Sequence, residues 1–511
     1  MKKYGCLAVA VIGLILFLIF RTTPTVSDLI IDILYVHQIS WLLVISTLVM
    51  TFISFYKADG AGYDESPWVA PAIAAVVLGI VWFVWLGIQD PIKMAALSDH
   101  TMYEDQNVSL VTQNEIRPYP YAIAAANIAT AKYDGTTAAG DLDYVQDRWT
   151  ASIDPNSFWV QLYRPTQGIF VMNNDYSVTP AIQPFTFSEK GILWNHAKSL
   201  IRSHEYFVEF SDVIYVRQGD GRYLAVTTLI KRAGFARYPY IYGVAVVSSE
   251  GLIEILPQSV AEADLRLQGI ALVPFDFETA RTEAYGWRNG VLNGIFDRTT
   301  RLTVHVSQVN AENASPFHLK STAGNMWYTT LSPLGSSTES ITTIAMSDSH
   351  DINGPVKIWR TEQTQSLPGT DFLASLIESA PNHLNLVWFH GGDKCGNAAL
   401  LEMVPVVRQE AGGPKLYFMG YVSAVNVSSN VRFYSVIDPE SRVVYEDLPS
   451  FEYVNRWLRG EYELNPVTEN SVTIDPTTSQ CLSPDLAQES DQVLIEYLRK
   501  ITDELERRLQ R

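Results

Sequence analysis

The sequence predicts an α+β protein with N-terminal transmembrane helices, then tandem antiparallel-meander modules with packed helices, and finally a C-terminal amphipathic helix. Three patterns support this fold class. They are long uncharged stretches near the N-terminus, a strand–strand–turn–strand pattern that occurs three times, and leucines at helical spacing near the end of the chain. With 511 residues, of which 47% are hydrophobic, the chain can form several domains with sizeable cores.

The first ninety residues predict a membrane anchor. Uncharged stretches cover residues 4–20, 39–56 and 66–89. Each is long enough to cross a hydrocarbon core of about 30 Å, so we predict three transmembrane helices within residues 1–91. The first stretch would alternatively serve as a signal peptide. Residues 28–38 are apolar but are broken by Asp28 and Asp32, which favours an interfacial helix.

Basic residues near the ends of these stretches predict the orientation. Lys2 and Lys3 place the N-terminus in the cytoplasm, and three crossings then place residues 92–511 outside it. Lys57, between the second and third stretches, agrees with this orientation. We therefore expect a multi-pass protein of the cell membrane with membrane lipid as a partner. If the second stretch were instead a buried helix, the large domain would be cytoplasmic.

The charge balance argues against nucleic-acid binding. The formal net charge is -18, and beyond residue 93 the chain has 32 basic and 49 acidic side chains. Such a surface repels phosphate backbones. It suits a hydrated, exposed domain or a basic protein partner.

Changes in composition divide the rest of the chain. We predict a linker with a short helix over residues 92–156, one or more α+β modules over 157–270, a second module over 271–365, a third over 366–459, a linker over 460–483 and the C-terminal helix over 484–511. The expected helices lie at residues 118–135, 188–203, 278–296 and 371–379. Residues 136–156 are expected to form a loop, and residues 158–164, 168–174 and 383–392 to form strands.

The meander pattern is clearest over residues 222–257. There an alternating strand is followed by the apolar run YGVAVV, a Ser-Glu-Gly turn and the strand LIEIL. Further copies span residues 326–360 and 415–449. Helices precede the strands in the predicted modules, which predicts small curved sheets with a helix on one face.

A strand of the RYLAV type, a long loop, YGVAVVSSEG and then LIEIL resemble the PepSY and cystatin-like modules of extracytoplasmic proteins. The resemblance covers about 35 residues in each copy. Those families include inhibitors, propeptide-like regulators and adaptors. The resemblance therefore implies binding or assembly rather than catalysis.

The end of the chain predicts a long helix. Ser483 is suited to the N-cap and Pro484 to the first turn. An apolar seam follows, made of Leu494, Leu498, Ile501 and Leu505. A seam this narrow suits a partner helix, as in a homo-oligomer or a complex with another protein, or the flank of its own domain.

The most reactive stretch is residues 390–397. His390 and Cys395 would support a thiolate nucleophile. The simpler interpretation is a glycine turn in which Cys395 forms a disulfide with Cys481, a pairing that would require an oxidising compartment. The order of the residues does not decide between a disulfide and two free thiols.

No other pattern carries a catalytic, cofactor or metal signature. The loop with Asp348, His350 and Asp351 is interpreted as a polar turn, so we predict no metal and no cofactor. Asn107 and Asn426 match the glycosylation pattern.

The sequence thus predicts a non-enzymatic, membrane-anchored extracytoplasmic scaffold or structural subunit of a larger envelope or surface assembly. The alternatives are an extracytoplasmic ligand- or peptide-binding regulator and a Cys/His hydrolase.

Overall fold

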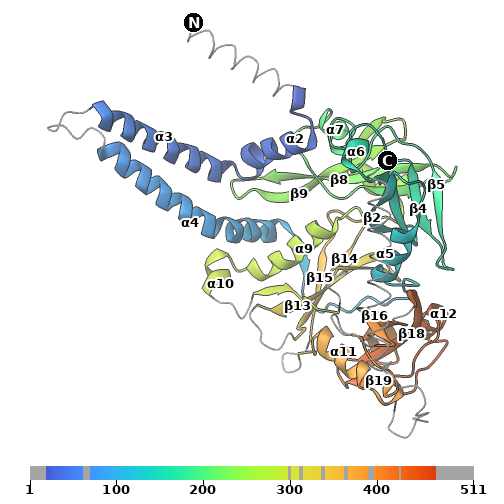
Figure 1. Ribbon diagram of the computed structural model, residues 1–511. Helices are drawn as coiled ribbons and strands as arrows, with labels where there is room; N and C mark the ends of the chain where they lie inside the picture. Colours follow the sequence, from blue (N-terminus) through green and yellow to red (C-terminus); the bar gives the residue numbers. More distant parts are fainter. Residues whose placement is uncertain are drawn as a thin grey trace, which may run out of the picture.

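The computed structural model describes residues 19–60, 69–296, 301–309, 315–334, 340–361, 366–389, 396–424 and 427–467. It has a mixed α+β architecture, in which two long helices project from a body built of several antiparallel sheets (Figure 1). The α+β fold class predicted from the sequence is confirmed. The predicted C-terminal helix, residues 484–511, lies outside the described residues.

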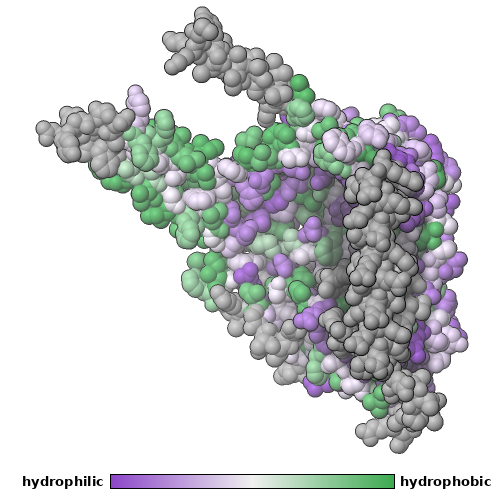
Figure 2. Space-filling view, viewed as in Figure 1, coloured by the Kyte–Doolittle hydropathy of each residue, from purple (hydrophilic) through white to green (hydrophobic). Residues whose placement is uncertain are grey.

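The N-terminal region consists of helices. They are α2 (Pro24–Ile31), the π-helix η1 (Asp32–Val36), α3 (Gln38–Gly60) and α4 (Val69–His100). The last two pack against each other as an antiparallel pair. Both are long and apolar enough to cross a membrane. Figure 2 shows their apolar side chains on the outer surface, whereas polar residues cover much of the body.

These helices match the second and third uncharged stretches and the predicted helix at residues 28–38. Of the first stretch, the structure describes only its last two residues. The third helix is longer than the stretch that predicts it, because it continues through Pro91 to His100. Residues 92–100 therefore belong to a helix and not to a linker. Pro91 removes one backbone donor inside the helix, and the helix nevertheless continues to His100.

The body contains four sheets. The first is β2 (Thr137–Val145), β3 (Arg148–Pro155), β4 (Gly168–Met172) and β5 (Val178–Ile182); the second has β6 (Glu209–Phe210), β7 (Ile214–Arg217), β8 (Tyr223–Ala233), β9 (Tyr238–Val247) and β10 (Ile253–Pro257). The third has β1 (Tyr103–Glu104), β11 (Leu302–Val304), β12 (Phe317–Ser321), β13 (Gly324–Pro333), β14 (Thr343–Asp348) and β15 (Val356–Arg360); the fourth has β16 (Ala399–Glu410), β17 (Gly413–Ala424), β18 (Val427–Asp438) and β19 (Val443–Val444).

Neighbouring strands in these sheets pair antiparallel, except that β1 pairs parallel with β15. The three predicted meanders form β8–β9–β10, β13–β14–β15 and β17–β18–β19. In the first of them Ala225 lies opposite Val247, and Val247 lies opposite Ile253. Whether the three copies are true repeats, and whether the chain divides at the predicted module boundaries, stays a prediction.

The first sheet is predicted only in part: β4 lies within residues 168–174, where a strand is expected, whereas β2 and β3 are not expected. Residues 136–156 form the hairpin β2–β3 instead of a loop, and the sheet runs across the predicted boundary at residues 156 and 157. Two features make these strands difficult to recognise from the sequence. The strand β2 has a bulge at Gly140 and Asp141 that breaks its alternation. The strand β3 is buried on both faces although it contains polar residues.

Three other expectations are wrong. Residues 158–164 include the short helix α6 (Phe158–Gln161), because β3 already pairs with β2 and β4 and the chain must turn between them. Of the helix expected at residues 188–203, only α7 (Ala197–Arg202) forms, since Gly191 packs tightly against Asn195. Residues 384–389 form no strand beyond a single bridge at Trp388.

The remaining helices cover the sheets. They are α5 (Tyr121–Thr130), α8 (Gln258–Ala263), η2 (Leu265–Leu267), α9 (Phe275–Ala284), η3 (Tyr285–Trp287), α10 (Val291–Phe296), α11 (Thr370–Glu378), η4 (Pro381–His383) and α12 (Phe451–Leu458). The largest core packs the third and fourth sheets around Tyr328, Phe418 and Trp457. The expected helix at residues 371–379 is present, but its N-cap is Gly369. Asp371 instead accepts a hydrogen bond from the Gln308 backbone at 3.0 Å.

Candidate binding cleft

A cleft of about 490 Å³ lies where the first three sheets meet. Its walls come from β2 and β3 of the first sheet, the β6–β8 region of the second, and β12 and β13 of the third. Clefts of this size between packed units are where proteins most often bind small ligands. We therefore treat it as the candidate site.

One edge of the cleft is a central segment, residues 270–274, which joins the second and third sheets. Thr228 donates a hydrogen bond to the Leu272 carbonyl at 2.8 Å, and the Trp327 indole donates to the Val273 carbonyl at 2.9 Å. The backbone amides of Leu272 and Val273 both donate to the Ser349 carbonyl. The segment thus fixes the spacing between the two walls.

Three carboxylates line the cleft, and each comes from a different part of the chain. Asp143 lies on β2, Asp212 on the β6–β7 connection and Asp276 at the start of α9. Burial, together with the charges of Asp212 and Asp141, raises the pKa of Asp143 to about 8. Burial and neighbouring carboxylates also raise the pKa of Asp212. At neutral pH the Asp143 carboxyl is therefore mostly protonated.

Aromatic rings and one arginine form another wall. Arg117 is buried, and its guanidinium lies 5.5 Å from the Tyr144 ring centroid and 5.3 Å from that of Trp149. Among the described residues no ion pair joins Arg117 to a carboxylate. The guanidinium is instead stabilised by cation–π interactions with these two rings.

The floor of the cleft contains a neutral histidine. The His318 ring lies 4.9 Å from that of Trp327, and its Nε2 is 3.0 Å from Ser349 Oγ. Burial lowers the pKa of His318 to about 3. The imidazole is therefore uncharged across the physiological range and contributes hydrogen bonding only.

The cleft is physically connected to the long apolar helices through α9. The cleft residues Phe275 and Asp276 begin this helix, and α9 packs against α4. Within α9, Glu278 forms a buried ion pair with Arg281. Ser347 on β14 donates a hydrogen bond to Glu278 at 2.8 Å, which ties α9 to the third sheet. A ligand that moved the start of α9 would therefore act on the end of α4.

A second polar cluster is buried behind β2. Asp154 accepts hydrogen bonds from Ser152, Thr166 and Ser188. Glu189 lies next to this carboxylate, and burial, together with the charge of Asp154, raises its pKa well above the usual range. Burial thus favours the protonated form of Glu189.

The described residues contain no group of three or more His, Cys, Asp or Glu side chains arranged to hold a metal ion. In the loop after β14, Asp348 accepts a hydrogen bond from the His350 backbone at 2.8 Å. The His350 ring lies 3.1 Å from the Ile270 carbonyl and 3.0 Å from that of Glu262. Asp348, His350 and Asp351 thus stabilise a loop, as the sequence interpretation of this stretch holds.

Most site residues predicted from the sequence lie outside the described residues. These are His390, Cys395, Cys481, Asn426 and the seam Leu494, Leu498, Ile501 and Leu505. The nucleophile, the disulfide and the partner helix all stay predictions. Asn107 is described; it is exposed and has a φ of 56°.

Sequence reasoning missed the cleft because its residues are far apart in the chain. Asp143 belongs to a stretch interpreted as a loop. Asp212 lies between two strands and Asp276 lies at the start of a helix, far from Asp143 in the sequence. Only the run Gly140-Asp141-Leu142-Asp143-Tyr144 carries a local signal, since its apolar and aromatic residues alternate with carboxylates.

Comparisons with known proteins do not assign the chain to a family. No protein-family model and no curated protein matches the sequence. Among solved structures, the chain is similar to the endo-arabinase from Bacteroides thetaiotaomicron VPI-5482, with 12% sequence identity and a TM-score of 0.19. The match covers 57% of this chain and 73% of that chain. A similarity this weak carries no functional argument.

Proposed function

We propose that the protein is a membrane-anchored scaffold or structural subunit whose body stands outside the cytoplasm. In this proposal the first uncharged stretch, residues 4–20, crosses the cell membrane together with α3 and α4. These three crossings place the N-terminus in the cytoplasm and residues 92–511 outside it. The body is non-enzymatic and contributes a rigid surface to a larger envelope or surface assembly. Protein partners, or further copies of the chain, bind through the C-terminal seam.

The observation that carries the proposal is the continuity of α4. Its apolar part, residues 69–89, is about 32 Å long at 1.5 Å per residue, which matches a bilayer core. The helix then continues into the body, where it packs against β9, α9 and η3. At its end the His100 ring stacks on Tyr238 with the centroids 4.2 Å apart. The absence of a break between span and body suits a support that holds its position.

The orientation is tested with an impermeant thiol reagent on intact cells. We expect Leu265→Cys, on an exposed turn of the body, to react from outside, and Tyr56→Cys, at the far end of α3, to react only after permeabilisation. The unsubstituted protein supplies the background from the native cysteines. The reverse pattern would place the body in the cytoplasm.

The assembly role is tested by purification of the tagged full chain in mild detergent. We expect a stoichiometric set of partners or a defined oligomer, and its loss when residues 484–511 are deleted. A single monomeric species from the full chain would contradict the scaffold proposal.

The cleft favours a second candidate, a ligand-binding regulator. Its aromatic rings and the carboxyl groups of Asp212 and Asp276 suit a small organic cation, because ring faces stabilise a cation and carboxylates attract it. The connection from Asp276 through α9 to α4 would carry the effect of binding to the membrane helices. Choline and spermidine are suitable probes.

This candidate predicts that such a cation raises the melting temperature of the full chain in detergent. The increase should disappear in Asp212→Asn but persist in Asp220→Asn, which alters an exposed turn outside the cleft. An equal increase in both variants would show that binding occurs elsewhere. The absence of any increase with either probe would argue against a cation site.

A further inference from the structure

The body approaches the membrane helices through a hairpin whose tip is apolar. The turn between β8 and β9 carries Phe235, which is 71% exposed. Its ring meets that of Trp85 on α4 edge-on, with the centroids 5.6 Å apart. Trp85 lies one helical turn, about 6 Å, on the membrane side of Gln89. The hairpin therefore reaches the level of the apolar span itself.

Two polar side chains mark where the span meets the body. Ser40 near the start of α3 donates a hydrogen bond to Gln89 on α4 at 3.1 Å. One turn further, Lys93 pairs with Asp90 at 2.7 Å. On α4, these are the first polar and charged side chains at the end of the uncharged stretch, and they place the membrane boundary near Gln89. Phe235 then lies at that boundary or slightly within it.

The π-helix η1 lies at the same level and is fixed to the hairpin. The Tyr35 hydroxyl accepts a hydrogen bond from the Arg232 amide at 2.8 Å and donates to its carbonyl at 3.3 Å. Leu29 and Leu34, on α2 and η1, are more than half exposed. On the other side of α4, the short helix α10 exposes Leu292 and Phe296. Figure 1 shows these elements at the end of the body from which α3 and α4 project.

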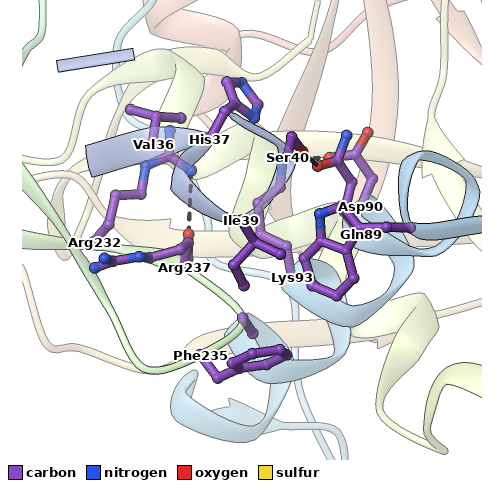
Figure 3. A pocket seen from close by; sticks show the side chains of 12 residues that line it. Val36, His37, Ile39, Ser40, Gln89, Asp90, Lys93, Arg232, Phe235 and Arg237 are labelled. Carbon is purple, nitrogen blue, oxygen red and sulfur yellow. Dashed lines mark hydrogen bonds and ion pairs between the residues drawn. The ribbon is translucent and has the colours of Figure 1, made fainter. Parts of the chain in front are cut away.

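A small pocket separates the hairpin tip from the helices. Figure 3 shows side chains from η1, α3, α4 and the hairpin converging on it, and its volume is about 100 Å³. Arg232 in its wall is neutralised by Glu209, with two hydrogen bonds at 2.6 and 2.7 Å. Arg237 differs, because its guanidinium donates to the uncharged Gln38 and lies 5.4 Å from the Tyr35 centroid. No ion pair joins Arg237 to a carboxylate among the described residues.

We propose that the hairpin tip and η1 lie in the headgroup layer of the bilayer, with Phe235 at the acyl-chain boundary and Arg237 on a lipid phosphate. The inference rests on the proposed membrane anchoring and adds a second contact with lipid beside the spans. Aromatic residues concentrate at this depth in membrane proteins. An arginine without a carboxylate partner is suited to phosphate, since its donors match the phosphate oxygens.

Depth measurements on the full chain in nanodiscs test the proposal. Nitroxide labels are introduced by Phe235→Cys and Leu34→Cys at the proposed interface, by Ile80→Cys on the exposed face of α4, and by Leu265→Cys on the body. The unsubstituted protein, labelled in parallel, gives the background of the native cysteines. Collision rates with oxygen and with a water-soluble nickel complex report the depth.

We expect the label at residue 80 to be deep, the labels at 34 and 235 to lie near the phosphate level, and the label at 265 to be in water. If the label at residue 80 is deep but the labels at 34 and 235 are as accessible to the nickel complex as the label at 265, the proposed lipid contact is wrong while the anchoring stands. If residue 80 is in water, the anchoring itself fails. Leu34→Cys provides the measurement if Phe235→Cys does not fold.

The role of Arg237 has its own readout. Nanodiscs containing equal amounts of phosphatidylglycerol and phosphatidylcholine are dissolved in mild detergent, and the lipids retained by the protein are counted by native mass spectrometry. We expect Arg237→Gln to retain less phosphatidylglycerol than the unsubstituted protein, and Arg222→Gln, an exposed arginine of the β7–β8 turn, to retain the same amount. Equal retention by both variants would exclude a phosphate at Arg237.

Discussion

Glu278 on α9 and Glu189 behind β2 are buried carboxylates that the fold accommodates in different ways. Glu278 forms an ion pair with the equally buried Arg281 and accepts a hydrogen bond from Ser347. Glu189 lies beside Asp154, has no ion pair with a cation among the described residues, and has a raised pKa. A buried carboxylate needs either a cation or a proton. The α9 region near α4 therefore uses a charge pair, whereas the first sheet contains a carboxyl group whose protonated form is favoured by burial.

The largest effect is expected when the charge pair is broken. Arg281→Met leaves Glu278 buried without its cation, and should cost about 3–5 kcal/mol of unfolding free energy. Urea unfolding of the full chain in detergent, followed by tryptophan fluorescence, measures the loss. Arg222→Met, which removes an exposed ion pair with Asp220, is the control and should change stability by less than about 0.5 kcal/mol.

The double variant Glu278→Gln with Arg281→Met sharpens this test. It removes both charges, so it should recover much of the stability lost in the single variant. If Arg281→Met were no more destabilising than the Arg222 control, the pair would not support α9.

A steric change should have the next largest effect, in the first sheet. Gly140 packs against the polar cluster, and a methyl group there would clash with Ser152 Oγ and lie 2.8 Å from the Asp154 carboxylate. We expect Gly140→Ala to destabilise the protein by about 1–3 kcal/mol. Gly135→Ala, at a position with no neighbouring atom within 4 Å, is the matched control. Equal unfolding curves for the two variants would show that the cluster tolerates displacement.

The raised pKa of Glu189 predicts that the stability of the fold depends on pH. Because the folded pKa is raised above the usual 4.5, its contribution to stability is complete below about pH 4.5 and is lost as pH rises toward the folded pKa. Glu189→Gln keeps the shape and removes the titration. The variant should therefore become progressively more stable than the parent protein as pH increases, measured as melting temperatures from pH 4 to 9. Asp220→Asn should instead become less stable than the parent protein as pH increases, since hydrogen bonds from Arg222 lower the pKa of Asp220.

Asp143 should show the same behaviour, because burial and the charges of Asp212 and Asp141 also raise its pKa. With a folded pKa of about 8, its contribution is complete below about pH 4 and is lost as pH rises through 8. The melting temperature of Asp143→Asn should therefore fall less with rising pH than that of the parent protein. A parallel pair of curves for variant and parent would mean that the cleft carboxylate is ionised at neutral pH.

The parts of the fold that sequence predicted are those with strong local patterns. The helices α3 and α4, the three meanders and the helix over residues 371–379 were all recognised from uncharged length, alternation or spacing. The strands β2 and β3 were not recognised, since Gly140 and Asp141 form a bulge and Asp154 is a buried polar residue. Neither pattern can be distinguished from a loop without knowledge of the partner strand.

The cleft and the two glutamates were beyond prediction for a different reason. Asp143, Asp212 and Asp276 become neighbours only through the packing of three sheets. The difference between Glu278 and Glu189 depends on which charge lies beside each carboxylate in space. Arg281 follows Glu278 by three residues on one helix, so the sequence indicates that they can form an ion pair. Nothing in the sequence shows that both side chains are buried.

If α4 crosses the membrane as proposed, its unbroken course makes the body sensitive to bilayer thickness. A membrane thinner than the apolar length of about 32 Å is accommodated by helix tilt. Because α4 has no joint before it enters the body, a tilt of the helix would tilt the body by a similar angle. The helix is about 48 Å long in total, so a modest tilt would displace distant parts of the body along the membrane plane. Lipid composition would thus set the direction in which the body faces its surroundings.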